Sequence, residues 1–236
     1  MATKRRFGVS TRLYEAKRLG RDHLLEIAAH GFEVVEIPAV RTHLDFANPA
    51  VVADLQQWLA EAGLELHGLH VPAGAPAADG DEALLVARRI PMPVLAVRVA
   101  KPRDGAKAVE RLAEAAAPLG VTVAVDSNSE ALTTTGSLVH FVEGFDARIG
   151  IAFDCAGVKR PAELPDAIEM ASEHLVAMHV PVESRIDWPS ALTTIQKVGY
   201  EGPLIVEPPP RTSTKDMLTL ARAARERFEK HLCTFI

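Results

Sequence analysis

The chain has 236 residues, of which 48% are hydrophobic and 24% are charged, and its formal net charge is -5 at pH 7. This length can bury one large core, and parallel barrels of this size commonly form a single domain. The net negative charge argues against a nucleic-acid partner, and no window approaches the roughly 18 apolar residues of a membrane span.

The amino-terminal segment and the cysteines bear on the compartment. The start, MATKRRFGVS, has basic residues but neither the apolar region nor the cleavage site of a secretory signal. Two cysteines, Cys155 and Cys233, provide neither a disulfide framework nor a CxxC motif. We therefore expect a cytoplasmic protein that does not insert into a membrane.

Short apolar runs typical of buried strands recur along the chain at a nearly constant spacing. They start 26 to 31 residues apart, at Phe7, Glu33, Leu64, Val94, Val121, Ile149, Val176 and Leu204. Segments with helical periodicity lie between them, such as 22–30, 48–62, 108–119, 165–175, 189–198 and 214–232. Several of these segments end on a glycine that suits a left-handed helix cap, as in HGFEVVEI, AGLELHGL, LGVTVAVD and VGYEGPLIVE.

Strand and helix thus alternate eight times. Near-continuous apolar strands that alternate with helices favour a parallel sheet. Eight repeats within 236 residues predict an α/β protein with a closed (β/α)8 TIM barrel. An open doubly wound sheet is the alternative fold.

In such a barrel the carboxyl ends of all strands meet at one mouth, where the active site lies. Seven predicted strands carry a polar or charged residue at or near this end: Glu36, His70, Arg98, Asp126, Asp154, His179 and Glu207. The last four of these are preceded, two positions earlier on the same face, by Ala124, Ala152, Ala177 and Ile205. Small residues on that face suit a tapering barrel interior, so the four side chains are expected to face the barrel axis.

Each of these residues also has an ordinary structural explanation. A carboxylate directly after a strand is often a helix N-cap or a turn residue, which applies to Asp126, Asp154 and Glu207. It applies most to Asp126, because DSNSE is rich in turn-forming residues. His179, within the apolar run VAMHV, is more often a hydrogen-bonded core residue than a ligand.

Taken together, the four residues favour a metal site. Three carboxylates that converge without a cation would repel one another and lose solvation together, so a metal ion is the simplest way to keep them ionised. A ligand set of three carboxylates and one histidine is rich in oxygen. It favours Mn²⁺ or Mg²⁺, with Co²⁺ or Zn²⁺ as alternatives.

The segments GFEVVEI, FDCAG, VAMHVPVESR and IDW…VGYEGPLIVE resemble the xylose isomerase-like barrels. This superfamily contains sugar and sugar-phosphate isomerases and epimerases, and also the endonuclease IV type of DNA repair enzyme. The resemblance spans nearly the whole chain and implies one barrel domain over residues 1–236. It implies a single divalent metal held at the ends of strands 5 to 8, here by Asp126, Asp154, His179 and Glu207. It also implies a functional arginine six residues after the histidine, at Arg185.

The chain departs from the pattern of this superfamily at two positions. Asp126 stands where a glutamate is usual, so its side chain is one methylene shorter. The Asp-x-x-His of strand 6 reads Asp154, Cys155, Ala156 and Gly157, so the histidine is missing. Neither strand 4 nor the segment after strand 7 supplies the additional histidines of the DNA repair enzymes, which argues against that activity.

The resemblance implies proton abstraction beside the carbonyl of a sugar, with an enediolate stabilised by the metal. We expect Glu207 to be the base and Asp126 to be the opposite acid/base partner. The expected function is therefore that of a metal-dependent sugar or sugar-phosphate isomerase or epimerase. A lyase or dehydratase of the inosose or dehydroshikimate type, and a non-catalytic barrel with a decayed metal site, are the alternatives.

Four further residues are expected to bind a small carbohydrate substrate: Arg185, His70, Glu36 and Arg98. The planar guanidinium of Arg185 suits a phosphate or carboxylate, although an exposed loop arginine explains it equally well. His70 and Glu36 also fit a core or strand-end role. Arg98 points either into the barrel or outward to a helix. The sequence carries no signature of an interface, so a homo-oligomer is left open.

Overall fold

The computed structural model describes residues 5–72, 77–130, 132–182, 185–210 and 213–233. The strands are β1 (Phe7–Ser10), β2 (Val34–Pro38), β3 (Glu65–Val71), β4 (Val94–Val97), β5 (Thr122–Asp126), β6 (Gly150–Asp154), β7 (Leu175–Pro181) and β8 (Leu204–Glu207). The helices are α1 (Arg21–Ala29), α2 (Pro49–Ala62), α3 (Ala77–Val86), α4 (Pro102–Ala116), α5 (Thr135–Glu143), α6 (Leu164–Ala171), α7 (Trp188–Lys197) and α8 (Thr214–Cys233). Every strand begins within one residue of the predicted position.

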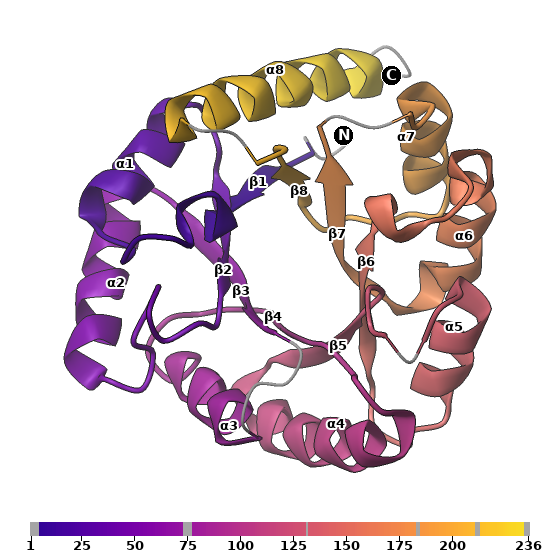
Figure 1. Ribbon diagram of the computed structural model, residues 1–236, viewed down its shortest axis with the longest axis horizontal. Coiled ribbons are helices and arrows are strands. Elements are labelled where there is room, and N and C mark those ends of the chain that lie inside the picture. Colours follow the sequence, from indigo (N-terminus) through magenta and orange to yellow (C-terminus); the bar gives the residue numbers. More distant parts are fainter. Residues whose placement is uncertain (1–4, 73–76, 131, 183–184, 211–212, 234–236) are drawn as a thin grey trace.

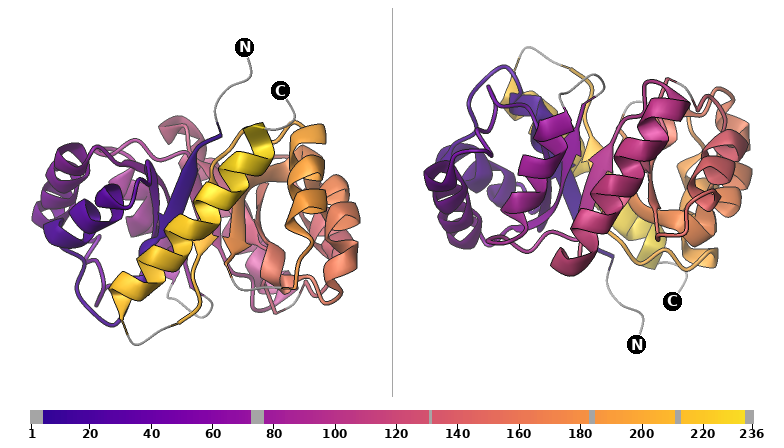
Figure 2. Two further views of the ribbon diagram at one scale, coloured as in Figure 1. Left: turned by 90° about the horizontal axis from the view of Figure 1, so that it is seen from above. Right: turned by 90° about the horizontal axis from the view of Figure 1, so that it is seen from below.

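The strands pair in chain order into one closed parallel barrel, and β1 pairs with β8 to close it. Figure 1 looks into this barrel and shows helices α1 to α8 arranged around it. The view from above in Figure 2 shows α8 running obliquely across the outside of the barrel, next to β1. The predicted (β/α)8 TIM barrel is confirmed, and the open doubly wound sheet is wrong.

The strands separate two apolar regions. The larger one lies between the barrel and its helices and includes Val123 and Val125 of β5. The smaller one fills the barrel interior and consists of Val94, Ala96, Ala124, Ala152 and Ala177. Because alternate residues of a strand face opposite sides, Asp126 lies on the interior face with Ala124. The predicted small-residue face is therefore the inner face.

Two irregularities in strand pairing lie just below the barrel mouth. The pairing of β2 with β3 shifts between Val35 and Glu36, and the pairing of β6 with β7 shifts between Ile151 and Ala152. Such bulges commonly occur next to active sites, where they re-aim a side chain. After the second shift, Asp154 is level with His179 on the neighbouring strand.

Helix ends follow the chemistry expected from the sequence. The four glycines predicted to end helices are the glycines with a left-handed backbone: Gly31, Gly63, Gly120 and Gly199. The side chain of Asn48 caps α2, and Thr134 with Ser137 forms a capping box at the start of α5. Among the described residues, no helix has the length and apolar character needed to cross a membrane.

Candidate functional site

Five of the seven strand-end residues predicted to line the barrel mouth are buried there. Exposed fractions are 1% for Asp126, 2% for Glu36, His70 and His179, and 9% for Asp154. The other two, Arg98 and Glu207, are partly buried. The structure brings these side chains together in two neighbouring groups, one around Asp126 and one around His179.

In the first group, Asp126 is held by His70 and Arg98. His70 Nε2 lies 2.7 Å from Asp126 Oδ2, and Arg98 Nε donates to the same oxygen at 2.8 Å. Arg98 therefore points inward, one of the two orientations expected from the sequence. Burial raises the pKa of Asp126, but His70 and Arg98 outweigh burial and hold that pKa well below its usual range.

Arg12 completes this group, although it is not among the site residues predicted from the sequence. It belongs to the short 3-10 helix η1 (Thr11–Tyr14) that follows β1, and its guanidinium lies 3.2 Å from His70 Nδ1. Because arginine can only donate, His70 Nδ1 accepts this hydrogen bond and the ring proton sits on Nε2, the nitrogen next to Asp126 Oδ2. The active site of such a barrel lies at the carboxyl ends of its strands, and β1 ends at Ser10, two residues before Arg12. Considering the end of β1 as well would therefore have identified Arg12.

The loop after β5 also confirms that Asp126 has the turn role considered as its ordinary explanation. Asp126 Oδ1 accepts the backbone N–H of Asn128 at 2.7 Å. The Ser129 hydroxyl donates to the Asp126 carbonyl at 2.6 Å and accepts the N–H of Val99 at 2.9 Å. One carboxylate oxygen thus fixes the turn while the other faces the barrel mouth.

In the second group, Glu36 and His179 form a buried ion pair. His179 Nε2 donates to Glu36 Oε2 at 2.8 Å, and the other Glu36 oxygen lies 3.9 Å from His70 Nδ1. Burial raises the pKa of Glu36, but His179, with smaller contributions from His70 and His67, outweighs burial and lowers that pKa to about 2. Burial lowers the pKa of His179, but Glu36, Glu207 and Asp154 together raise it to about 10. Glu36 therefore has a partner within the protein.

Asp154 and Glu207 differ in how they are held. Asp154 Oδ1 accepts the N–H of Ala156 at 2.7 Å, as the N-cap of the 3-10 helix η3 (Cys155–Gly157), and Oδ2 accepts from Asn128 Nδ2 at 2.5 Å. Within the described part of the chain, no hydrogen bond or ion pair engages the Glu207 carboxylate. Burial raises the pKa of Glu207, and His179 only partly opposes this. Glu207 is thus the carboxylate best suited to accept a proton.

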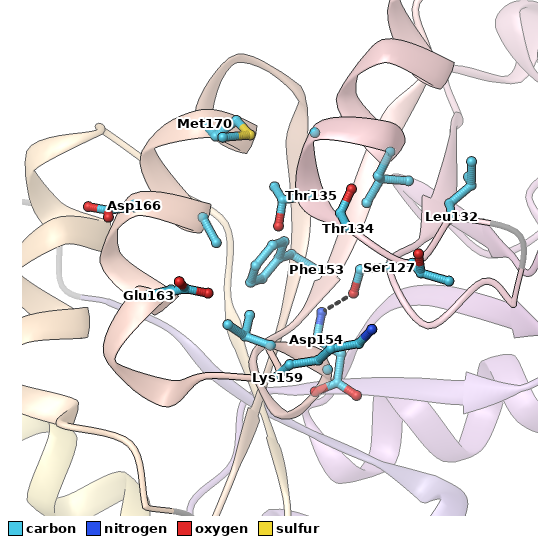
Figure 3. Close-up of a pocket in the computed structure, with 16 residues that line it drawn as sticks. Ser127, Leu132, Thr134, Thr135, Phe153, Asp154, Lys159, Glu163, Asp166 and Met170 are labelled. Atoms are coloured by element: carbon cyan, nitrogen blue, oxygen red, sulfur yellow. Dashed lines mark hydrogen bonds between the residues drawn. The ribbon is translucent and has the colours of Figure 1, made fainter.

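Two cavities open beside these residues. One, of about 400 Å³, is lined by Ser10, Arg12 and Glu207 among others, at the ends of β1 and β8. The other, of about 360 Å³, lies between the β5–α5 loop and α6. Figure 3 shows this second cavity, with Asp154 at one end and Met170 at the other. The mouth is therefore accessible next to both Glu207 and Asp154.

Arg185 is described by the structure but is not brought into either group. It lies exposed in the loop after β7. Among the described residues, none of the contacts around Asp126 or His179 involves it. Its expected role in substrate binding remains a prediction.

In the described residues, no three His, Cys, Asp or Glu side chains are arranged as ligands around one point. The chemistry of the donors nevertheless fits a divalent ion at Asp154, His179 and Glu207. A metal-ligating histidine commonly donates its other ring N–H to a carboxylate, as His179 does to Glu36, which leaves Nδ1 for a ligand. Three carboxylates around one imidazolium also leave negative charge that a cation would balance. Asp126, by contrast, already has Arg98 as a counter-ion.

Comparison with known proteins shows which solved structures share this architecture. No family model and no curated protein matches the sequence. Among solved structures, a D-psicose 3-epimerase from Clostridium cellulolyticum H10, solved with D-tagatose, has a TM-score of 0.81 at 17% identity, over 96% of this chain and 99% of that one. The chain has the fold of the xylose isomerase-like barrels. The resemblance predicted from the sequence is therefore confirmed for the fold.

Two further structures of this fold were solved with metals. A xylose isomerase-like TIM barrel protein from Mycobacterium smegmatis, in complex with magnesium, has a TM-score of 0.79 at 13% identity, over 98% of this chain and 97% of that one. The IolI protein with a bound zinc atom has a TM-score of 0.73 at 11% identity, over 95% of this chain and 98% of that one. Identities in this range show a shared architecture alone.

Proposed function

We propose that the protein is a divalent-metal-dependent isomerase or epimerase of a sugar or sugar phosphate that reacts through an enediolate. The observation that carries the proposal is Glu207, a carboxylate with a raised pKa and no partner among the described residues, next to His179 and Asp154 in an open barrel mouth. A raised pKa makes a carboxylate a stronger base, which suits a group that takes and returns a proton. The shared fold with a D-psicose 3-epimerase supports the same class of reaction.

The metal would be held by Asp154, His179 and Glu207, with Asp126 as the fourth ligand. Oxygen-rich donors of this kind favour Mn²⁺ or Mg²⁺, with Co²⁺ or Zn²⁺ as alternatives. When bound, such an ion supplies positive charge to the carbonyl oxygen and the neighbouring hydroxyl of a sugar. Asp126 would have to share its carboxylate between this ion and its contacts with Arg98 and His70.

The residues of the chain have distinct roles in this proposal. Glu207 removes the proton from the carbon next to the carbonyl, and Asp126 is the opposite acid/base partner. Arg98 and Arg185 bind substrate oxygens or an anionic substituent, because a guanidinium presents several donors in one plane. His70 and Glu36, expected from the sequence to contact substrate, act here mainly through Asp126 and His179, which they hold.

The test is proton exchange with solvent. The protein is incubated in D₂O with Mn²⁺ and a panel of ketoses and ketose phosphates, and NMR follows deuterium at the carbon next to the carbonyl. An isomerase or epimerase gives an isomer of the substrate that carries deuterium at that carbon and has lost no water. A dehydratase gives a product that has lost water, and a decayed site gives neither exchange nor Mn²⁺ binding, so either of these results would contradict the proposal.

Metal binding should depend unequally on the two aspartates. Asp154→Asn is expected to weaken Mn²⁺ binding by more than about 100-fold, because it removes a proposed ligand. Removing a residue that only orients a ligand already lowers metal affinity by about 10- to 100-fold. Asp126→Asn should have a smaller effect, because Arg98 and His70 already share its carboxylate. Calorimetric titration of chelator-stripped protein measures both, and equal losses would show that Asp126 binds the metal as fully as Asp154.

Mn²⁺ binding should also release a proton from His179. Its pKa of about 10 in the metal-free protein means that both ring nitrogens carry protons at neutral pH, and a metal must displace one of them. Affinity should therefore rise with pH, by about tenfold per unit, up to that value. Titrations in buffers of different ionisation enthalpy count the protons released at pH 7 to 8. A count near zero would mean that His179 binds no metal or is neutral beforehand.

A further inference from the structure

Gly157 has no backbone reason to be glycine. It ends the short helix η3, and it is not among the glycines with a left-handed backbone. Its surroundings supply the reason, because a Cβ added at Gly157 would lie 2.6 Å from Asn128 Oδ1. Any side chain at this position would therefore push the amide of Asn128 away.

The amide of Asn128 reaches Asp154 through the space that Gly157 leaves. Asn128 Nδ2 donates to Asp154 Oδ2 at 2.5 Å. The orientation of the amide follows from chemistry, since only its nitrogen can donate to a carboxylate. Its oxygen consequently faces Gly157, in agreement with the close approach described above.

The backbone around Asn128 is fixed by contacts with the ends of β5 and β6. Its backbone N–H is held by Asp126 Oδ1 at 2.7 Å. Ser127, the residue before it, accepts the backbone N–H of Asp154 at 2.8 Å, the dashed contact in Figure 3. Asn128 therefore connects two carboxylates of the barrel mouth, Asp126 through its backbone and Asp154 through its side chain.

We propose that Asn128 is a positioning residue that fixes the direction of the Asp154 carboxylate, and that Gly157 is glycine in order to admit it. With Ala156 N–H on Oδ1 and Asn128 Nδ2 on Oδ2, each oxygen of Asp154 has one donor, and the lone pairs that remain point in a fixed direction. The inference rests on the proposed function in that Asp154 is taken as a metal ligand. Position 157 is where the Asp-x-x-His pattern of the xylose isomerase-like barrels places its histidine. In this chain the amide of Asn128 occupies the space that a histidine side chain would need there.

The matched pair of variants is Gly157→Ala and Gly136→Ala. Both glycines line the cavity of Figure 3, but a Cβ at Gly136 lies no closer than 3.8 Å to another group, the sulfur of Met170. Gly157→Ala is expected to weaken Mn²⁺ binding by about 10- to 100-fold, as is Asn128→Ala, because both free the Asp154 carboxylate. Gly136→Ala should bind Mn²⁺ like the wild type.

The double variant separates positioning from a general loss of structure. If Gly157→Ala acts by displacing Asn128, it should have no further effect on Mn²⁺ affinity in an Asn128→Ala background. Additive losses of the two substitutions would overturn the inference. Melting temperatures of all variants show whether the fold is retained.

A second measurement uses metal-free protein, so that it does not depend on the proposed function. NMR of the Asn128 side-chain NH₂, identified by its absence in Asn128→Ala, should show a shifted signal in the wild type that moves toward that of a free amide in Gly157→Ala and Asp154→Ala. A signal that does not move would overturn the inference. Wild-type protein that fails to bind Mn²⁺ would overturn the proposed function, whereas normal Mn²⁺ affinity in Gly157→Ala would overturn only the positioning role.

Discussion

Glu207→Gln is expected to lower kcat for isomerisation or epimerisation by about 10²- to 10⁴-fold, the range found when a general acid/base is removed. The amide has nearly the same size as the carboxylate but cannot accept the proton. Deuterium exchange into the substrate should fall by the same factor, because both reactions pass through the same proton abstraction. The measurement is NMR exchange in D₂O with saturating Mn²⁺, so that weaker metal binding does not by itself lower the rate.

Glu15→Gln is the matched control for this substitution. Glu15 lines the same cavity as Glu207 but is exposed. Its replacement should leave the exchange rate unchanged. Glu207→Gln should also keep or raise the melting temperature of metal-free protein, since it removes a carboxylate whose charged form burial disfavours. Exchange at the wild-type rate in Glu207→Gln would exclude Glu207 as the base.

The sequence predicted the architecture because the strands and helices are encoded locally. An apolar run of a few residues defines each strand, a glycine ends several of the helices, and the spacing of strands counts the repeats. The inward direction of Asp126 and Asp154 followed from the same periodicity, since Ala124 and Ala152 two residues earlier fill the barrel interior. These features need no knowledge of distant contacts.

The partners of the site residues could not be predicted in this way. Glu36 and His179 are 143 residues apart and meet across the barrel, at a height set by bulges that the sequence does not mark. Arg98 had two equally good directions, and only the position of Asp126 on the next strand decides between them. Which side chains contact one another depends on burial, strand register and charge together. The sequence therefore predicted the residues at the strand ends but not which of them form pairs.

Two residues were missed for a different reason. Arg12 follows a short first strand, and the polar residues before it conceal the strand end. Asn128 lies in DSNSE, where every residue fits a turn, and the turn does form. Only the contact of its side chain with Asp154, in the space beside Gly157, shows that it does more than turn the chain.

Glu36→Gln is expected to destabilise metal-free protein by about 3 to 5 kcal/mol, the usual cost of removing one partner of a buried ion pair. The substitution removes the charged carboxylate that accepts the Nε2 hydrogen bond of buried His179, and burial keeps bulk water from replacing it. Urea unfolding of chelator-treated protein at pH 6 measures the difference. Glu169→Gln, which breaks the exposed pair with Lys197, is the control and should cost less than about 1 kcal/mol.

The pH dependence of the free energy of unfolding tests whether the Glu36–His179 ion pair causes the loss of stability in Glu36→Gln. The pKa of Glu36 falls from an ordinary 4.5 to about 2 in the fold, so its stabilising contribution is complete above about pH 4.5 and is lost as the pH falls toward 2. The pKa of His179 rises from 6.5 to about 10, so its contribution is complete below about pH 6.5 and is lost as the pH rises toward 10. Wild-type stability should therefore be greatest between these two limits, and Glu36→Gln should flatten the profile on both sides. If the variant kept the wild-type profile, the ion pair would not exist in solution, and His179 would lack the carboxylate that orients it toward a metal.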